Sequence, residues 1–358
     1  MKVTNSEYAC LSSFLMRSLF FGPAIYSILH FALQDGWISV ILSFVLSFIP
    51  LIIYYKLLNH NPDDNIVTLN NKLGIVGKII NIILTIFVIF HACLILWNLT
   101  NFIYSQFLFQ TPLFVIAIVL LIGIFYVSTK NLTTIARTGT IFFIISTILY
   151  ITAVLSLIKE FDVNGLKPIL NSGIFPVLKG SFSSLGLNIL PLFIILIIPK
   201  NDIKNNDKVL SSFFKVYTFI YLCMLFVLII CVAILGIELT NLYQYPEYHI
   251  LKTINIANFF QRVESILSIQ WIFDAVMAMS LCIYYAKESL TKTFKFKNKF
   301  NLINIIAIVI ILFVSQYIFS SNTVAEAFYK NIYPFLTFGF FLIVPLIILI
   351  ITKIKKTT

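Results

Sequence analysis

The chain has 358 residues, of which 60% are hydrophobic and only 11% are charged. An ordinary soluble domain has about 25% charged residues, so this composition excludes a soluble enzyme and a disordered chain. A membrane helix needs about 20 mostly apolar residues, so the chain could form about ten such helices. The net charge of +11 would by itself fit a nucleic-acid partner, but the distribution of the basic residues argues against one.

Ten apolar runs predict an all-α integral membrane protein with ten transmembrane helices. The first helix should begin at a capping box, because Thr4 is followed three residues later by Glu7. This run carries Arg17 and the pair Gly22-Pro23 and lacks a small-residue cleavage site, so it is not a cleavable signal peptide. We expect a single transmembrane domain over residues 1–358. The runs occupy residues 9–33, 37–58, 76–102, 111–128, 138–158, 181–199, 209–237, 259–286, 301–320 and 330–352.

The basic residues predict the orientation of the chain in the membrane. If the N-terminus is cytoplasmic, about three-quarters of the 25 Lys and Arg residues fall on the cytoplasmic side. Both termini are therefore expected in the cytoplasm. The excess positive charge then reflects membrane topology, and we expect no nucleic-acid partner.

Helix breakers occur at corresponding positions of two predicted halves, repeat one at about 9–158 and repeat two at about 181–352. Span 1 contains Gly22-Pro23, and span 6 contains Gly186 and Pro191. Paired breaks of this kind are typical of a transporter binding site, because a broken helix frees backbone groups that a substrate can satisfy. The alternative is that each proline merely kinks its helix.

Ionisable residues inside the spans are the second indication of a site. Asp274 in span 8 is either a partner for a cation or a proton, or a paired structural residue. Arg17 either pairs with an acid from another helix or extends to the cytoplasmic face. His91 is expected to be a hydrogen-bonded packing residue.

No catalytic, nucleotide-binding or metal-binding motif is present in the sequence, so we expect no enzymatic activity, cofactor or metal. The five cysteines lie in apolar runs and are interpreted as small packing residues. The predicted outer loop Glu238–Asn258 is rich in aromatic residues and is either a lid over a binding site or a passive connector.

Three segments resemble the endospore germination permeases, which are the B-subunits of nutrient germinant receptors. The first includes Arg262 and Glu264 at the start of span 8 and is followed by Trp271. The second includes Arg137 at the entry to span 5. The third is the turn-rich outer loop 166–180 before span 6.

This resemblance implies the five-plus-five inverted-repeat, LeuT-like fold of the amino acid–polyamine–organocation superfamily, with helices 1 and 6 broken. It implies a place in the inner spore membrane, with an A-type membrane subunit and a C-type lipoprotein as partners. The expected ligand is a small germinant, usually an amino acid. Relatives commonly have an acidic residue after the span 6 break, where this chain has Asn188 and no acid.

The predicted binding site lies between the breaks of spans 1 and 6. A proton- or sodium-coupled amino-acid symporter is the alternative function, and a structural membrane subunit with a vestigial pocket is the second alternative. The candidate substrate-binding residues are Phe21, Gly22, Pro23, Ala24, Trp97, Asn98, Ser184, Leu185, Gly186, Asn188, Trp271 and Asp274, and the family-motif residues are Arg137, Arg262 and Glu264.

Overall fold

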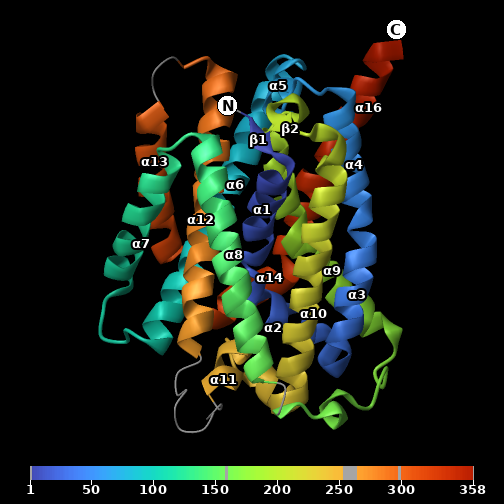
Figure 1. Ribbon diagram of the computed structural model, residues 1–358, viewed down its shortest axis with the longest axis vertical. Coiled ribbons are helices and arrows are strands. Elements are labelled where there is room, and N and C mark those ends of the chain that lie inside the picture. Colours follow the sequence, from blue (N-terminus) through green and yellow to red (C-terminus); the bar gives the residue numbers. More distant parts are fainter. Residues whose placement is uncertain (1, 158–159, 253–263, 297–299, 358) are drawn as a thin grey trace.

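The computed structural model describes residues 2–157, 160–252, 264–296 and 300–357. It is a bundle of helices that run mostly along one direction, with the N- and C-termini at the same end (Figure 1). The first half contains α1 (Asn5–Arg17), η1 (Phe20–Ala24), α2 (Ile25–Ala32), η2 (Leu33–Asp35), α3 (Gly36–Leu46), α4 (Phe48–His60), α5 (Ile66–Asn71), α6 (Ile75–Gln106), α7 (Leu113–Ser128) and α8 (Leu132–Ser156).

The second half follows the short helix η4 (Val163–Leu166) and has the same helical character. A two-residue parallel pairing joins β1 (Val3–Thr4) to β2 (Ile203–Lys204). The elements of this half are α9 (Ile174–Ile194), η5 (Ile195–Ile197), η6 (Lys200–Asp202), η7 (Asn206–Lys208), α10 (Val209–Leu242), α11 (Pro246–Lys252), α12 (Glu264–Phe294), α13 (Phe300–Tyr317), α14 (Asn322–Asn331), α15 (Tyr333–Phe338), η8 (Gly339–Ile343) and α16 (Val344–Thr357).

Within the described ranges, seven helices are long and apolar enough to cross a membrane, or eight if the bent pair at residues 301–331 is one span. This confirms a multi-pass helical membrane protein. The predicted count of ten is not reached by this measure for two reasons. The half-helix α1 has 13 residues because span 1 is interrupted, and α7 has only 16. The count of ten spans therefore stays a prediction.

The polar start of the chain forms the predicted capping box. Thr4 N–H donates to Glu7 Oε2 at 2.7 Å, and Glu7 N–H donates to Thr4 Oγ1 at 3.3 Å. These two bonds satisfy amide groups that the first turn of α1 leaves free. The helix therefore begins at Asn5, as the sequence predicts.

Span 1 is interrupted where the sequence predicts it. After α1 ends at Arg17, the turn η1 is π-helical, and the amide of Ala24 reaches the carbonyl of Leu19 at 3.2 Å. Gly22 has φ +74°, a left-handed conformation that glycine adopts without strain, and Pro23 has no amide hydrogen to donate. These two residues explain why the regular α-helix stops here.

The break that the sequence predicts at residues 184–188 of span 6 is wrong. Helix α9 is continuous from Ile174 to Ile194, and Pro191 lies inside it. Gly186 serves close packing instead, because a Cβ at this position would lie 2.6 Å from Cα of Pro334 on α15. Regular α-helix gives way only after Ile194, to the 3₁₀ turn η5.

Helix α1 lies inside the bundle, where it contacts α8, α9, α10 and α12. Its side chains from Tyr8 to Arg17 are all buried. Outer helices expose large apolar side chains, as expected for contact with lipid, for example Val119 and Ile122 on α7 and Ile148 on α8. The break in span 1 is therefore held in the protein interior, where other helices can reach it.

Candidate functional site

The interrupted part of span 1 meets a carboxyl group from a distant part of the chain. The backbone N–H of Gly22 donates a hydrogen bond to Oε1 of Glu247 on α11 at 2.8 Å. Glu247 is only 2% exposed. The break thus presents a backbone amide that binds a carboxyl oxygen, as the freed amides of a broken helix can do.

Helix α11 and the two residues before it close over the break, at the end of the molecule opposite the termini (Figure 1). A Cβ on Gly22 would lie 3.0 Å from the ring of Tyr245 and 3.3 Å from the carbonyl oxygen of Gln244. The residue at position 22 must therefore be small as well as left-handed. Residues 244–252 of the predicted outer loop cover the break in this structure, which favours the lid interpretation over the passive connector.

An aromatic cluster joins this cover to the helices below it. The ring of Phe102 on α6 lies 5.1 Å from that of Tyr245, 5.1 Å from that of Tyr248 and 4.5 Å from that of Trp271 on α12. Tyr245 and Trp271 are 5.6 Å apart. Trp271, a predicted site residue, thus packs against the cover of the break, whereas Phe102 was missed because it is an ordinary apolar residue of an apolar run.

Side-chain amides tie the same cover to α6 and α14. The hydroxyl of Tyr245 donates to the carbonyl of Asn98 at 3.3 Å, so Asn98 is brought to the break through its backbone. Asn101 donates to Oδ1 of Asn322 at 2.7 Å, and Asn322 donates to Oε1 of Gln244 at 2.8 Å. The cover is therefore fixed by polar contacts as well as by rings.

A buried ion pair lies one turn before the break. Arg17 Nη2 is 2.6 Å from Asp274 Oδ1 and donates to Ser146 Oγ at 2.8 Å, so it joins α1, α12 and α8. The guanidinium also lies over the rings of Phe14 and Phe143, at 5.3 and 5.5 Å. Arg17 thus pairs with an acid from another helix, and Asp274 is the paired residue.

The predicted residues of α9 point to neighbours other than the cover. Ser184 Oγ lies 2.9 Å from Ser43 Oγ on α3. Asn188 donates to the carbonyl of Ser184 at 2.9 Å and to the hydroxyl of Tyr221 on α10 at 3.3 Å. Leu185 is buried beside them. These contacts fasten α9 to α3 and α10, although α9 also touches η1.

The other predicted residues are placed as follows. Trp97 packs edge-to-face on Phe319, with ring centroids 5.0 Å apart. Pro23 and Ala24 are buried in η1, and the side chain of Phe21 lies outside the described part of the structure. His91 shares a 2.9 Å hydrogen bond with the hydroxyl of Tyr333, as expected for a packing residue.

Two of the three family-motif residues, Arg137 and Glu264, make their hydrogen bonds and ion pairs with residues outside the break. Arg137 is largely exposed, and its Nε is 4.0 Å from Glu7 Oε1. Glu264 begins α12, where its carbonyl accepts a hydrogen bond from Ser268 at 3.0 Å. Arg262 lies outside the described residues.

Two small cavities meet at Tyr150 of α8, between the ion pair and the cover. One is lined by Arg17, Phe20 and Gln270 among others, and the second by Glu247 and Leu267 among others. Each of them has room for only one or two water molecules in this structure. Glu247 was missed because no local pattern distinguishes an acid in a loop between two predicted spans.

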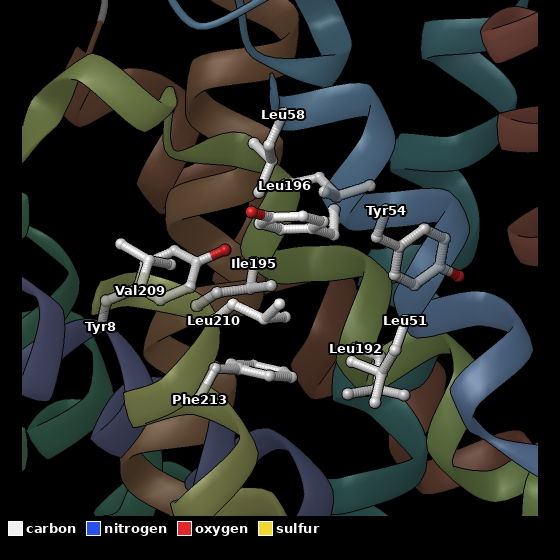
Figure 2. A pocket seen from close by; sticks show the side chains of 11 residues that line it. Tyr8, Leu51, Tyr54, Leu58, Leu192, Ile195, Leu196, Val209, Leu210 and Phe213 are labelled. Atoms are coloured by element: carbon white, nitrogen blue, oxygen red, sulfur yellow. The ribbon is translucent and has the colours of Figure 1, made fainter. Parts of the chain in front are cut away.

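A further pocket lies in another part of the bundle, between α4, the end of α9 and α10 (Figure 2). No predicted site residue lines it, and its lining has three tyrosines but no charged side chain. Such an apolar lining does not suit a zwitterion, whose two charges would remain unpaired. The lining residues are Tyr8, Leu51, Tyr54, Tyr55, Leu58, Leu192, Ile195, Leu196, Val209, Leu210 and Phe213.

The architecture is that of solved membrane transporters. A Na⁺-coupled sialic acid symporter in a substrate-bound outward-open state superposes with a TM-score of 0.61, covering 94% of this chain and 79% of the symporter at 10% identity. A manganese transporter of Eremococcus coleocola gives a TM-score of 0.59, covering 96% of this chain and 78% of the transporter at 12% identity. These similarities show the predicted all-α, LeuT-like fold. The chain therefore has the fold of these membrane transporters.

Sequence comparison then identifies the family. The family model described as "Spore germination protein" matches residues 13–324, so the chain belongs to this family of spore permeases. The spore germination protein YndE of Bacillus subtilis is 28% identical over 277 residues, which are 74% of this chain and 73% of that protein. The spore germination protein A2 of the same organism is 24% identical over 285 residues, 78% of this chain and 76% of that protein.

Proposed function

We propose that the chain is the B-subunit of a spore germinant receptor and that it binds a small germinant with a carboxylate, such as an amino acid, at the break of span 1. The observation that carries this proposal is the hydrogen bond from Gly22 N–H to a carboxyl oxygen at 2.8 Å. A ligand carboxylate could make the same bond. Family membership supplies the germination context.

The rest of the ligand would extend toward the cavity lined by Arg17, Phe20 and Gln270. This cavity has room for about one water molecule in the present structure, so it would have to widen when the ligand binds. Of the twelve candidate residues, Gly22, Pro23 and Ala24 form the break, and Asn98 and Trp271 hold its cover. Asp274 would act through Arg17, which it neutralises. The residues of α9 would support the site from the side, because α9 contacts η1.

Signalling requires that the ligand favour one of two states of the protein, because a ligand with equal affinity for both shifts nothing. The chain would pass this shift to an A-type membrane subunit and a C-type lipoprotein in the inner spore membrane, by binding rather than catalysis. Cytoplasmic termini agree with the two ends of the chain lying at the same end of the bundle (Figure 1).

Two other functions are supported by particular observations. The fold likeness to a Na⁺-coupled symporter favours an amino-acid symporter, with protons or sodium as the coupling ion. The Gly22 amide is already bound by Glu247 of the same chain, which favours a structural subunit whose pocket is vestigial.

Deletion of the gene in the source organism separates these functions. Spores would be tested for germination against the standard L-amino acids, and growing cells for uptake of the same compounds. The receptor proposal expects loss of particular germination responses with unchanged uptake. Normal germination with impaired uptake of one amino acid would overturn it in favour of the symporter. A structural subunit would be indicated by two results together. The deletion strain would lose every germination response, and Gly22 variants with a normal protein level would keep them all.

A further inference from the structure

Glu247 fills a position that the proposed function assigns to the ligand. Its Oε1 accepts the hydrogen bond from Gly22 N–H, although the two residues are 225 positions apart in the sequence. Its Oε2 is buried and hydrogen-bonds to no other residue among those described. A buried carboxyl oxygen without such a bond is unfavourable. This cost makes it easier for another acceptor to replace Glu247 at the Gly22 amide.

The segment that carries Glu247 is attached to the bundle by contacts that can open. We call residues 244–252 the lid. Besides the amide chain through Asn322, Lys252 donates to Oε1 of Gln106 at 3.0 Å on the exposed outer face. These exposed polar bonds each contribute little net free energy, because water replaces them when they break. The aromatic contacts of Tyr245 and Tyr248 close the inner face.

We propose that Glu247 is an internal competitor that holds the Gly22 amide in the unliganded protein, and that a germinant carboxylate activates the protein by displacing it and releasing the lid. This inference rests on the proposed function, because it takes the break of span 1 as the ligand site. It makes the site selective in a defined way. A ligand must offer Gly22 an acceptor that replaces the Glu247 carboxyl.

The competition has a measurable consequence. When the binding-competent state is only a fraction of the population, the apparent affinity for ligand falls by that fraction. Removing Glu247 should therefore lower the ligand concentration needed for a response. A hydrogen bond to an uncharged carboxyl group contributes about 1 kcal/mol net, which sets the expected decrease at about fivefold.

The test uses spores that carry the full receptor with Glu247→Ala, compared with wild type. Each standard L-amino acid is assayed at graded concentrations, and any active one is assayed again as its amide, which lacks the carboxylate. The expected result is that Glu247→Ala decreases the half-maximal concentration of the active amino acid about fivefold or produces germination without it. The matched control is Glu238→Ala, which removes an exposed carboxylate near the C-terminal end of α10. This variant should leave the half-maximal concentration unchanged.

An unchanged or increased half-maximal concentration in Glu247→Ala, at a normal protein level, would overturn the inference. If that variant does not accumulate in the membrane, Gln244→Ala takes its place, because it loosens the lid through Asn322 and leaves Gly22 untouched. It should decrease the half-maximal concentration about twofold, as expected for one exposed hydrogen bond, and no decrease would overturn the inference.

The amide separates this inference from the proposed function. If wild-type spores respond equally to the amino acid and to its amide, the carboxylate site at Gly22 is wrong, whatever Glu247 does. If the acid is preferred and Glu247→Ala still fails to decrease the half-maximal concentration, only the competition by Glu247 is wrong.

Discussion

Arg17 and Asp274 form an ion pair in the middle of the bundle, with Nη2 and Oδ1 2.6 Å apart and both side chains almost completely buried. The pair joins α1, just before the break of span 1, to α12. An ionised residue inside a membrane protein is unfavourable unless it is paired, so each of these residues depends on the other. The pair therefore fixes the position of the break relative to α12.

Asp274→Asn should destabilise the protein by about 3–5 kcal/mol, because it leaves the Arg17 charge buried and uncompensated. Thermal unfolding of the detergent-purified protein measures the effect. Asp64→Asn is the matched control, because it breaks an ion pair whose Lys72 is exposed, and it should change stability by only about 0–1 kcal/mol. Equal effects of the two substitutions would contradict the structural role of the buried pair.

Gly22→Ala should abolish the response to germinant. A left-handed conformation costs a residue with a Cβ about 1–2 kcal/mol, and the added atom would also press on the ring of Tyr245. Germination at saturating amino acid, together with the protein level, measures the outcome. Gly123→Ala on α7 is the control, because its Cβ would enter open space. A normal response in Gly22→Ala spores would exclude the break as the ligand site.

Gly186→Ala should destabilise the packing of α9 on α15 by about 1–3 kcal/mol, the usual effect of overpacking a core. The reason is the 2.6 Å separation between its Cβ and Cα of Pro334, since backbone cannot move aside easily. Thermal unfolding again provides the measurement, with Gly123→Ala as reference. An unchanged unfolding temperature would show that the two helices are not in this close contact.

The response to germinant should depend on pH through Glu247, which lies outside the membrane-spanning helices. Burial raises the pKa of this carboxyl from 4.5 to about 8, against the opposing effect of its own backbone and of Gly22 N–H. The closed lid therefore holds a proton more tightly than the open one. Its stability is greatest below about pH 4.5 and decreases as the pH rises to about 8.

The half-maximal ligand concentration should accordingly decrease between about pH 5.5 and 8, and Glu247→Gln should remove this dependence. The same variant leaves any contribution of His249, on the same helix, in place. A dependence that persists in Glu247→Gln would assign the titration to another group. The neighbouring side chains that interact with Glu247 are phenols and a thiol, whose ordinary pKa values lie above this window: Tyr26, Tyr245 and Cys231.

Orientation in the membrane can be tested with single cysteines, because the five native cysteines are buried. Asn171→Cys on the loop before α9 should react with a membrane-impermeant maleimide in intact cells. Lys208→Cys, at the start of α10, should react only after permeabilisation. Both positions are exposed on the protein. The reverse pattern would place the termini outside the cytoplasm.

Local features of this protein could be predicted from the sequence. The membrane class follows from hydrophobic content, the start of α1 from the capping pair Thr4 and Glu7, and the break of span 1 from Gly22-Pro23. Each of these depends on neighbouring residues, and the backbone preferences of glycine and proline act wherever the chain is placed. The family resemblance was likewise carried by short segments.

The tertiary structure alone decided the rest. Gly186 and Pro191 have the same breaking tendency as the residues of span 1, yet α9 is continuous, because close packing on Pro334 uses the glycine in a helical conformation. The partner of Asp274 lies 257 residues away, and that of Gly22 lies 225 residues away. Such pairs arise from helix packing and from the path of a long loop, and no local pattern of residues specifies either of them.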